Sequence, residues 1–173
     1  RKGVYASQYL TPDHTARQMA ALAMRYFDND SRIVDACCGT GQLTRALLLE
    51  GVHPSAILGF DADAELVDLY ERLYPDAAAL RMQFREIDFH CENVIANPPF
   101  EVPECTVFLQ WLSRIQCSGD RAVLLLPSGF IDKQRPRSVQ ETMRHFIVHH
   151  RIPMQEPFAR TNCRAEIVML ERV

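Results

Sequence analysis

The sequence predicts an α/β fold, a doubly wound sheet of seven strands with helices on both faces. The strands are expected to be mostly parallel, with one antiparallel strand near the C-terminus. Short apolar runs alternate along the chain with stretches of helical periodicity. Residues 122–126 are continuously apolar, as a central strand buried on both faces should be. A loop with two glycines joins the first predicted strand to the helix after it.

Each predicted strand is a short apolar run bounded by polar or turn residues. The predicted strands are residues 32–36, 56–60, 80–84, 93–96, 122–126, 147–152 and 165–170. The segment 131–138, after the fifth strand, is polar and basic and is the expected mobile loop. No repeat or internal boundary interrupts this pattern. We therefore expect one domain over 1–173, with an N-terminal helical region at 1–28 and a sheet core at 29–173.

The predicted helices begin and end at residues that favour helix termini. Thr11 is the expected N-cap of the first helix, with Pro12 in its first turn. Gly51 ends the second helix, and Asp63 caps the third. The predicted helices are residues 11–26, 42–50, 63–74, 103–115 and 139–146.

Composition points to a water-soluble protein. The chain has 173 residues, 47% hydrophobic and 24% charged, and it contains no apolar run near the ~20 residues that span a bilayer. No signal peptide is visible, so we expect a cytoplasmic protein without a membrane partner. The first residue is not Met, which indicates a processed chain or a piece of a longer one. The six cysteines and the histidines show no metal-binding spacing, so no metal site is expected.

The charge is unevenly distributed along the chain. The net charge is −3, but residues 121–164 carry eight Lys and Arg against three acidic residues. The preceding 120 residues are net acidic. The 121–164 half could therefore dock on a polyanion such as DNA or RNA. A merely solvated basic surface is an equal alternative on charge alone.

The most informative segment is Asn97-Pro98-Pro99-Phe100, directly after the apolar run 94–96. The prolines impose a stiff, extended turn. At the carboxyl end of a strand, where open α/β sheets bind ligands, the Asn97 side-chain oxygen and the Pro98 carbonyl can both act as acceptors. Such a turn, with an aromatic ring beside it, could hold a planar group that bears an NH2.

The loop at 35–41 reads Asp-Ala-Cys-Cys-Gly-Thr-Gly. Gly39 and Gly41 let the backbone turn sharply and approach a ligand closely. A third glycine, typical of pyrophosphate-binding loops, is absent, and Asp35 would repel a phosphate but suits a cationic amine. Asp61 ends the second strand, where a carboxylate can accept both hydroxyls of a ribose.

In their order, these motifs resemble class I S-adenosylmethionine-dependent methyltransferases, and the Asn-Pro-Pro-Phe form is typical of N6-adenine enzymes. The resemblance implies a Rossmann-like fold, S-adenosylmethionine as cofactor and methyl transfer to adenine in DNA. It implies that Asn97, Pro98, Pro99 and Phe100 are catalytic, and that Phe158, before the last strand, stacks on the target base with Phe100. The cofactor contacts that it implies are Tyr9, Thr11, Pro12, Asp35, Cys37, Gly39, Gly41, Asp61, Ala62, Asp88, Phe89 and Asn97.

The N-terminal segment Gln8-Tyr9-Leu10-Thr11-Pro12 is typical of the gamma class of these DNA enzymes. The target-recognition domain that usually follows the catalytic core has no counterpart here. It has been trimmed away, or it belongs to a partner subunit, or the enzyme has little selectivity. An RNA or a protein glutamine is an alternative acceptor, and a non-catalytic subunit is a second alternative. A nicotinamide dehydrogenase is disfavoured by the missing third glycine.

Overall fold

The computed structural model describes residues 10–28, 30–132, 137–155, 158 and 163–173. Its strands are β1 (Ile33–Ala36), β2 (Ile57–Asp61), β3 (Ala78–Arg81), β4 (Asn93–Ala96), β5 (Arg121–Pro127), β6 (Phe146–Pro153) and β7 (Ala165–Arg172). Its helices are α1 (Asp13–Tyr26), α2 (Gln42–Leu49), α3 (Ala64–Leu73), α4 (Val102–Ile115) and α5 (Arg137–Met143), with 3-10 turns η2 (Pro54–Ala56) and η3 (Phe84–Glu86).

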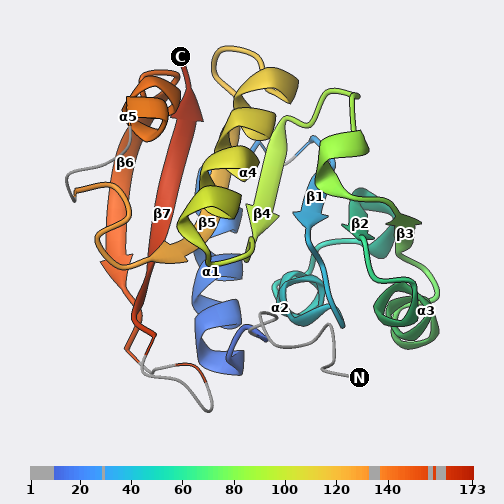
Figure 1. The fold of residues 1–173 in the computed structure, drawn as a ribbon. Coiled ribbons are helices and arrows are strands. Elements are labelled where there is room, and N and C mark those ends of the chain that lie inside the picture. The colour runs from blue at the N-terminus through green and yellow to red at the C-terminus, as the bar shows by residue number, and fades with distance from the viewer. Residues whose placement is uncertain (1–9, 29, 133–136, 156–157, 159–162) are drawn as a thin grey trace, which may run out of the picture.

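The strands form one seven-stranded sheet in the order β3-β2-β1-β4-β5-β7-β6 (Figure 1). β7 is antiparallel to both β5 and β6, whereas the other neighbouring pairs are parallel. The predicted fold class is therefore confirmed, including the antiparallel strand near the C-terminus. None of the helices in the described ranges combines the length and apolarity needed to cross a membrane.

The two faces of the sheet support separate cores, because successive strand residues point to opposite sides. In β1, Val34 packs into the core beneath α4 and α5, and Ile33 packs into the core beneath α1 and α2. Figure 1 shows α4 in front of β4 and β5, with α1 behind the sheet. The central strands β4 and β5 are buried on both faces, as the continuous apolar run at 122–126 predicts.

β3 ends earlier than predicted, at Arg81 rather than residue 84. Phe84 instead begins η3, where its ring contacts Phe108 at 5.3 Å and Trp111 at 5.7 Å between centroids. Burial of Phe84 in the aromatic cluster under α4 therefore outweighs its strand propensity. As a consequence, residues 82–85 form a turn at the carboxyl end of β3.

The start of α1 also differs from expectation. Pro12 occupies the cap position, and no side chain caps the helix. The expectation that Thr11 caps α1 is wrong, because its hydroxyl accepts a hydrogen bond from Asn97 Nδ2 at 3.0 Å. Thr11 thus ties the chain before α1 to the carboxyl end of β4.

Candidate active site

A cavity of about 360 Å³ opens at the carboxyl ends of β1, β2, β3 and β4. Its volume lies in the range of small-molecule sites. The position is the point where the strand order reverses between β1 and β4, the usual ligand site of an open α/β sheet. The predicted site residues that line it are Thr11, Cys37, Gly39, Asp61, Ala62, Asn97, Pro98, Pro99 and Phe100.

The glycine loop has three residues in the left-handed region: Cys37 (φ 58°), Gly39 (φ 54°) and Gly41 (φ 85°). A Cβ on Gly41 would clash with the ring of Tyr74, directly after α3, and would lie 3.0 Å from Tyr70 Cδ2 of α3, so packing disfavours a side chain there. A Cβ on Gly39 would meet no atom within 4 Å. Gly41 is thus required by packing, whereas Gly39 leaves open space beside the cavity for a ligand.

Two thiols in the same loop, Cys37 and Cys38, are not activated. Their pKa values are raised, chiefly because burial disfavours the thiolate, and the nearby Asp35 and Asp61 raise them further. Both side chains therefore stay neutral at physiological pH. The loop contributes shape and backbone groups to the cavity rather than a nucleophile.

Asp61, the last residue of β2, joins the glycine loop to the segment before α3 through its carboxylate. Its Oδ2 accepts the Gly39 N–H at 2.9 Å, and its Oδ1 accepts the Asp63 N–H at 2.9 Å. A carboxylate has about four acceptor positions, so each oxygen can accept one more hydrogen bond. The backbone bonds fix the carboxylate where it lines the cavity.

Asp35 lies behind the loop and not among the residues that line the cavity. It is 0% exposed, and its Oδ2 accepts from the Thr44 N–H at 3.0 Å and the Thr44 hydroxyl at 2.7 Å. Burial raises the pKa of Asp35 to about 7, although the Thr44 hydrogen bonds lower it. Its Oδ1 has no hydrogen-bond partner among the described residues. Asp35 therefore holds the start of α2 in place, and its role toward a ligand amine stays a prediction.

The Asn97 turn faces the cavity from the end of β4. Because Asn97 Nδ2 donates to Thr11 Oγ1, the amide oxygen is the end of the side chain that can accept from a ligand amine. Pro98 is buried, and the Pro99 carbonyl accepts the Cys105 thiol at 2.9 Å. α4 therefore anchors the turn that the two prolines stiffen.

Phe100 and Phe158 come together although they are 58 residues apart in the sequence. Their ring centroids lie 4.9 Å apart with an interplanar angle of 80°, and the rings are only 9% and 2% exposed. A base between two parallel rings needs about 7 Å, twice the ~3.4 Å rise per base. The predicted aromatic sandwich is therefore closed in this structure, with the rings in edge-to-face contact.

Other predicted site residues lie elsewhere. Asp88 and Phe89 do not line the cavity, and Phe89 borders a separate shallow pocket near the start of β4. Gly41 and Pro12 are not among the residues that line the cavity, and Tyr9 is outside the described residues.

Sequence reasoning missed the turn that follows β3. The cavity is lined there by Met82, Gln83, Phe84 and Arg85, and Glu104 of α4 forms an ion pair with Arg85 at 2.8 Å. The rule that ligands bind at carboxyl ends of strands would have found this turn, had the end of β3 been placed correctly.

Part of the basic charge at 121–164 is compensated within the described residues. Arg151 pairs with Asp132 at 2.6 Å and with Glu166 at 2.8 Å, and Arg137 pairs with Glu141. Arg121 lies over the Tyr26 ring. Lys133, Arg135 and Arg160 lie outside the described residues, as does part of the loop expected to be mobile. Among the described arginines of this half, Arg144 and Arg164 are exposed and remain the best candidates for contact with a polyanion.

Comparison of the structure with solved structures identifies a methyltransferase fold. A proposed RNA methyltransferase from Pyrococcus horikoshii aligns with a TM-score of 0.76 and 20% identity, over 100% of this chain and 89% of that one. A modification subunit of a proposed type I restriction enzyme from Vibrio vulnificus YJ016 has a TM-score of 0.76 and 18% identity, over 98% of this chain and 46% of that one.

The magnesium protoporphyrin IX methyltransferase from Synechocystis PCC 6803, solved with bound S-adenosylmethionine, has a TM-score of 0.72 and 13% identity, over 93% of this chain and 79% of that one. This chain spans less than half of the restriction-enzyme subunit. No family model matches the sequence, and no curated protein matches it. At these identities, the likeness establishes the fold.

Proposed function

We propose that this chain transfers a methyl group from S-adenosylmethionine to the exocyclic N6 amino group of adenine in DNA. One observation carries the proposal. Asn97-Pro98-Pro99-Phe100 borders the same cavity as the glycine loop and Asp61, with the Asn97 amide nitrogen held by Thr11. A cofactor site and an amine-accepting turn are thus adjacent.

The residues around the cavity fit the proposed cofactor. The open space beside Gly39 can take its amino-acid part, and Asp61 has acceptor positions left for the two ribose hydroxyls. Apolar side chains of Leu66, Met82 and Phe84 line the same cavity and can cover the adenine ring. When bound, S-adenosylmethionine supplies a methyl group that is already activated on a sulfonium.

The Asn97 turn would act on the acceptor. The lone pair of an adenine amino group is delocalised into the ring, which makes the nitrogen a poor nucleophile. Hydrogen bonds from its two N–H groups to Asn97 Oδ1 and the Pro98 carbonyl make the nitrogen more electron-rich. These bonds strengthen as positive charge develops, so they stabilise the transition state more than the ground state.

Binding of the base requires a rearrangement of the aromatic pair. Because Phe100 and Phe158 contact each other edge-to-face, the Phe158 ring must move before a flipped-out base can stack between them. We expect this movement to accompany acceptor binding. The active arrangement of the site would then form only with a base present.

RNA is the second candidate acceptor, favoured by the likeness to the proposed RNA methyltransferase from Pyrococcus horikoshii. Neither the Asn97 turn nor the aromatic pair distinguishes flipped DNA bases from those of single-stranded RNA. A recognition domain or a separate specificity subunit would make that choice. The restriction-enzyme subunit is longer than this chain, which covers 46% of it.

The test is transfer of labelled methyl from S-adenosylmethionine to unmethylated DNA and, in parallel, to RNA, with nucleoside analysis of the products. Asn97→Ala should reduce turnover by at least 100-fold, about 2.7 kcal/mol of lost transition-state stabilisation, while cofactor affinity stays within a few-fold. Asn93→Ala is the matched control, because Asn93 lies on the same strand and donates to the Asp28 carbonyl away from the cavity. An active Asn97→Ala protein would contradict the mechanism, and product on RNA alone would replace DNA as the acceptor.

A further inference from the structure

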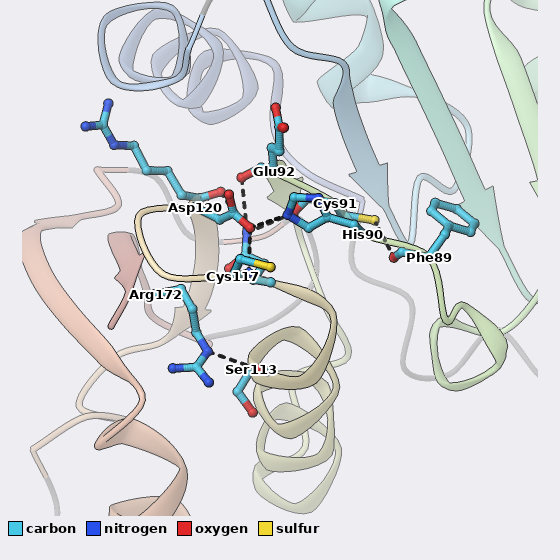
Figure 2. Close-up of polar contacts among 10 residues, drawn as sticks. Phe89, His90, Cys91, Glu92, Ser113, Cys117, Asp120 and Arg172 are labelled. Atoms are coloured by element: carbon cyan, nitrogen blue, oxygen red, sulfur yellow. Dashed lines mark hydrogen bonds and ion pairs between the residues drawn. The ribbon is translucent and has the colours of Figure 1, made fainter.

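Near the amino ends of β4 and β5, at the end of the sheet opposite the cavity, three side chains with metal-binding atoms converge: His90, Cys117 and Asp120 (Figure 2). One potential ligand atom from each lies within 4.8 Å of the others. His90 Nε2 donates to Asp120 Oδ2 at 2.5 Å. His90 precedes β4, whereas Asn97 follows it, so this cluster and the cavity lie at opposite ends of the same strand.

Backbone hydrogen bonds hold the cluster together independently of any ligand. Asp120 Oδ2 accepts the Cys117 N–H at 2.6 Å, and the Asp120 N–H donates to the Cys117 carbonyl at 3.1 Å. The next residue, Arg121, donates its N–H to the Glu92 carbonyl at 2.9 Å. The turn between α4 and β5 is thereby tied to the segment that carries His90.

The three donors are an imidazole nitrogen, a thiol sulfur and a carboxylate oxygen. This set suits Zn²⁺, whereas Mg²⁺ and Ca²⁺ prefer oxygen alone. The Asp120 side chain is 13% exposed and the His90 side chain 46%, while Cys117 is also exposed. An ion can therefore reach the cluster from solvent, and a water molecule can complete a tetrahedron.

The His90–Asp120 pair requires only a small adjustment. Zn–N and Zn–O bonds of about 2.1 Å at a tetrahedral angle place the two ligand atoms about 3.4 Å apart. The His90–Asp120 contact must then open by roughly 1 Å from its present length, which rotation of the half-exposed imidazole can supply. Cys91, the adjacent thiol, is turned away and contacts the Phe89 carbonyl at 3.6 Å (Figure 2), so it is not a fourth ligand.

We propose that His90, Cys117 and Asp120 form a Zn²⁺ site with water as the fourth ligand. The ion would join the start of β4 to the turn between α4 and β5, and its effect would be on stability rather than on the cavity at the far end of β4. The alternative is a simple surface ion pair between His90 and Asp120, with the Cys117 thiol nearby but uninvolved.

The first experiment titrates reduced, chelator-treated protein with Zn²⁺ against a competing chromophoric chelator. One equivalent should bind, and Cys117→Ser should weaken binding at least tenfold. Co²⁺ should give a thiolate charge-transfer band that is absent in Cys117→Ser. Two matched controls should leave both signals unchanged: Cys163→Ser, and His149→Ala, which removes a comparable histidine–carboxylate pair with Glu171 at 2.9 Å.

A second measurement uses the wild type alone, in case a variant fails to fold. Cys117 is exposed, whereas the other five cysteines are buried or half-buried. One equivalent of Zn²⁺ should slow alkylation of Cys117 at least tenfold, as followed by mass spectrometry. Absence of stoichiometric binding, equal affinity in Cys117→Ser, or unchanged Cys117 alkylation in the presence of Zn²⁺ would overturn the proposal in favour of the simple ion pair.

Discussion

Replacing Asp35 by Asn should make the unfolding free energy of the protein less sensitive to rising pH. Asp35 is fully buried, and its pKa is raised from 3.8 to about 7. The folded state therefore binds more protons at this group than the unfolded state does between these two pKa values. The contribution of Asp35 to stability must therefore fall as pH rises through that window and level off above about pH 7.

The magnitude follows from the size of the shift. Each pKa unit corresponds to about 1.36 kcal/mol, so a shift of about three units destabilises the folded state by roughly 4 kcal/mol above pH 7. The amide introduced by Asp35→Asn would keep an acceptor for Thr44, but its NH2 would occupy the position of Oδ1, which has no partner among the described residues. That unsatisfied group costs about 1–3 kcal/mol, so the net gain of Asp35→Asn should be about 1–3 kcal/mol at pH 8.

The assay is urea denaturation followed by circular dichroism at pH 5, 6, 7 and 8, below the range in which the buried thiols ionise. The difference in unfolding free energy between Asp35→Asn and the wild type should grow by up to about 1.4 kcal/mol per pH unit from 5 to 7. Thr44→Val offers an internal check. It removes a hydrogen bond that lowers the pKa of Asp35, so the decline in stability should extend to higher pH. A difference between Asp35→Asn and the wild type that is constant from pH 5 to 8 would refute the reasoning.

Four further substitutions test the cavity and the residues around it. Asp61→Ala should weaken S-adenosylmethionine binding by about 10–150-fold, since hydrogen bonds to a charged group contribute about 1.5–3 kcal/mol; unchanged calorimetric affinity would remove its role toward the ribose. Gly41→Ala should lower the unfolding free energy by about 1–3 kcal/mol, because its Cβ would clash with Tyr74. Gly39→Ala should lower thermal stability less than Gly41→Ala does, but it should weaken cofactor binding. A larger loss of stability in Gly39→Ala, with cofactor binding weakened only in Gly41→Ala, would contradict the roles given to the two glycines. Phe158→Leu should raise the acceptor KM by about 5–150-fold, the equivalent of ~1–3 kcal/mol of lost stacking; an unaffected KM would point to a protein glutamine as acceptor.

The sequence predicts the fold well wherever burial dictates residue type. The continuous apolar run at 122–126 correctly predicts β5, and the glycine loop correctly marks the end of β1. Few other arrangements would bury those apolar residues. Asp63 also caps α3 as predicted, since both of its hydrogen bonds are local.

Contacts between distant segments explain what sequence reasoning missed. Thr11 looked like a helix cap, but its partner is Asn97, 86 residues away. β3 ends before its predicted end because Phe84 packs on α4. The cluster of His90, Cys117 and Asp120 joins residues up to 30 positions apart and matches no short metal motif. Periodicity and local spacing contain no information on such pairings.

The hydrogen bond from Asn97 to Thr11 couples the orientation of the Asn97 side chain to the position of the chain before α1. The two ends of an amide group are nearly identical in shape, and the hydrogen bond to the Thr11 hydroxyl distinguishes them because it takes an N–H donor. Displacing Thr11 would remove a hydrogen bond that favours the orientation in which the amide oxygen, rather than the N–H donors, faces an amine. Under the proposed function, an event at the amino-terminal segment would thus lower methyl transfer while the residues proposed to hold the cofactor's ribose stay intact.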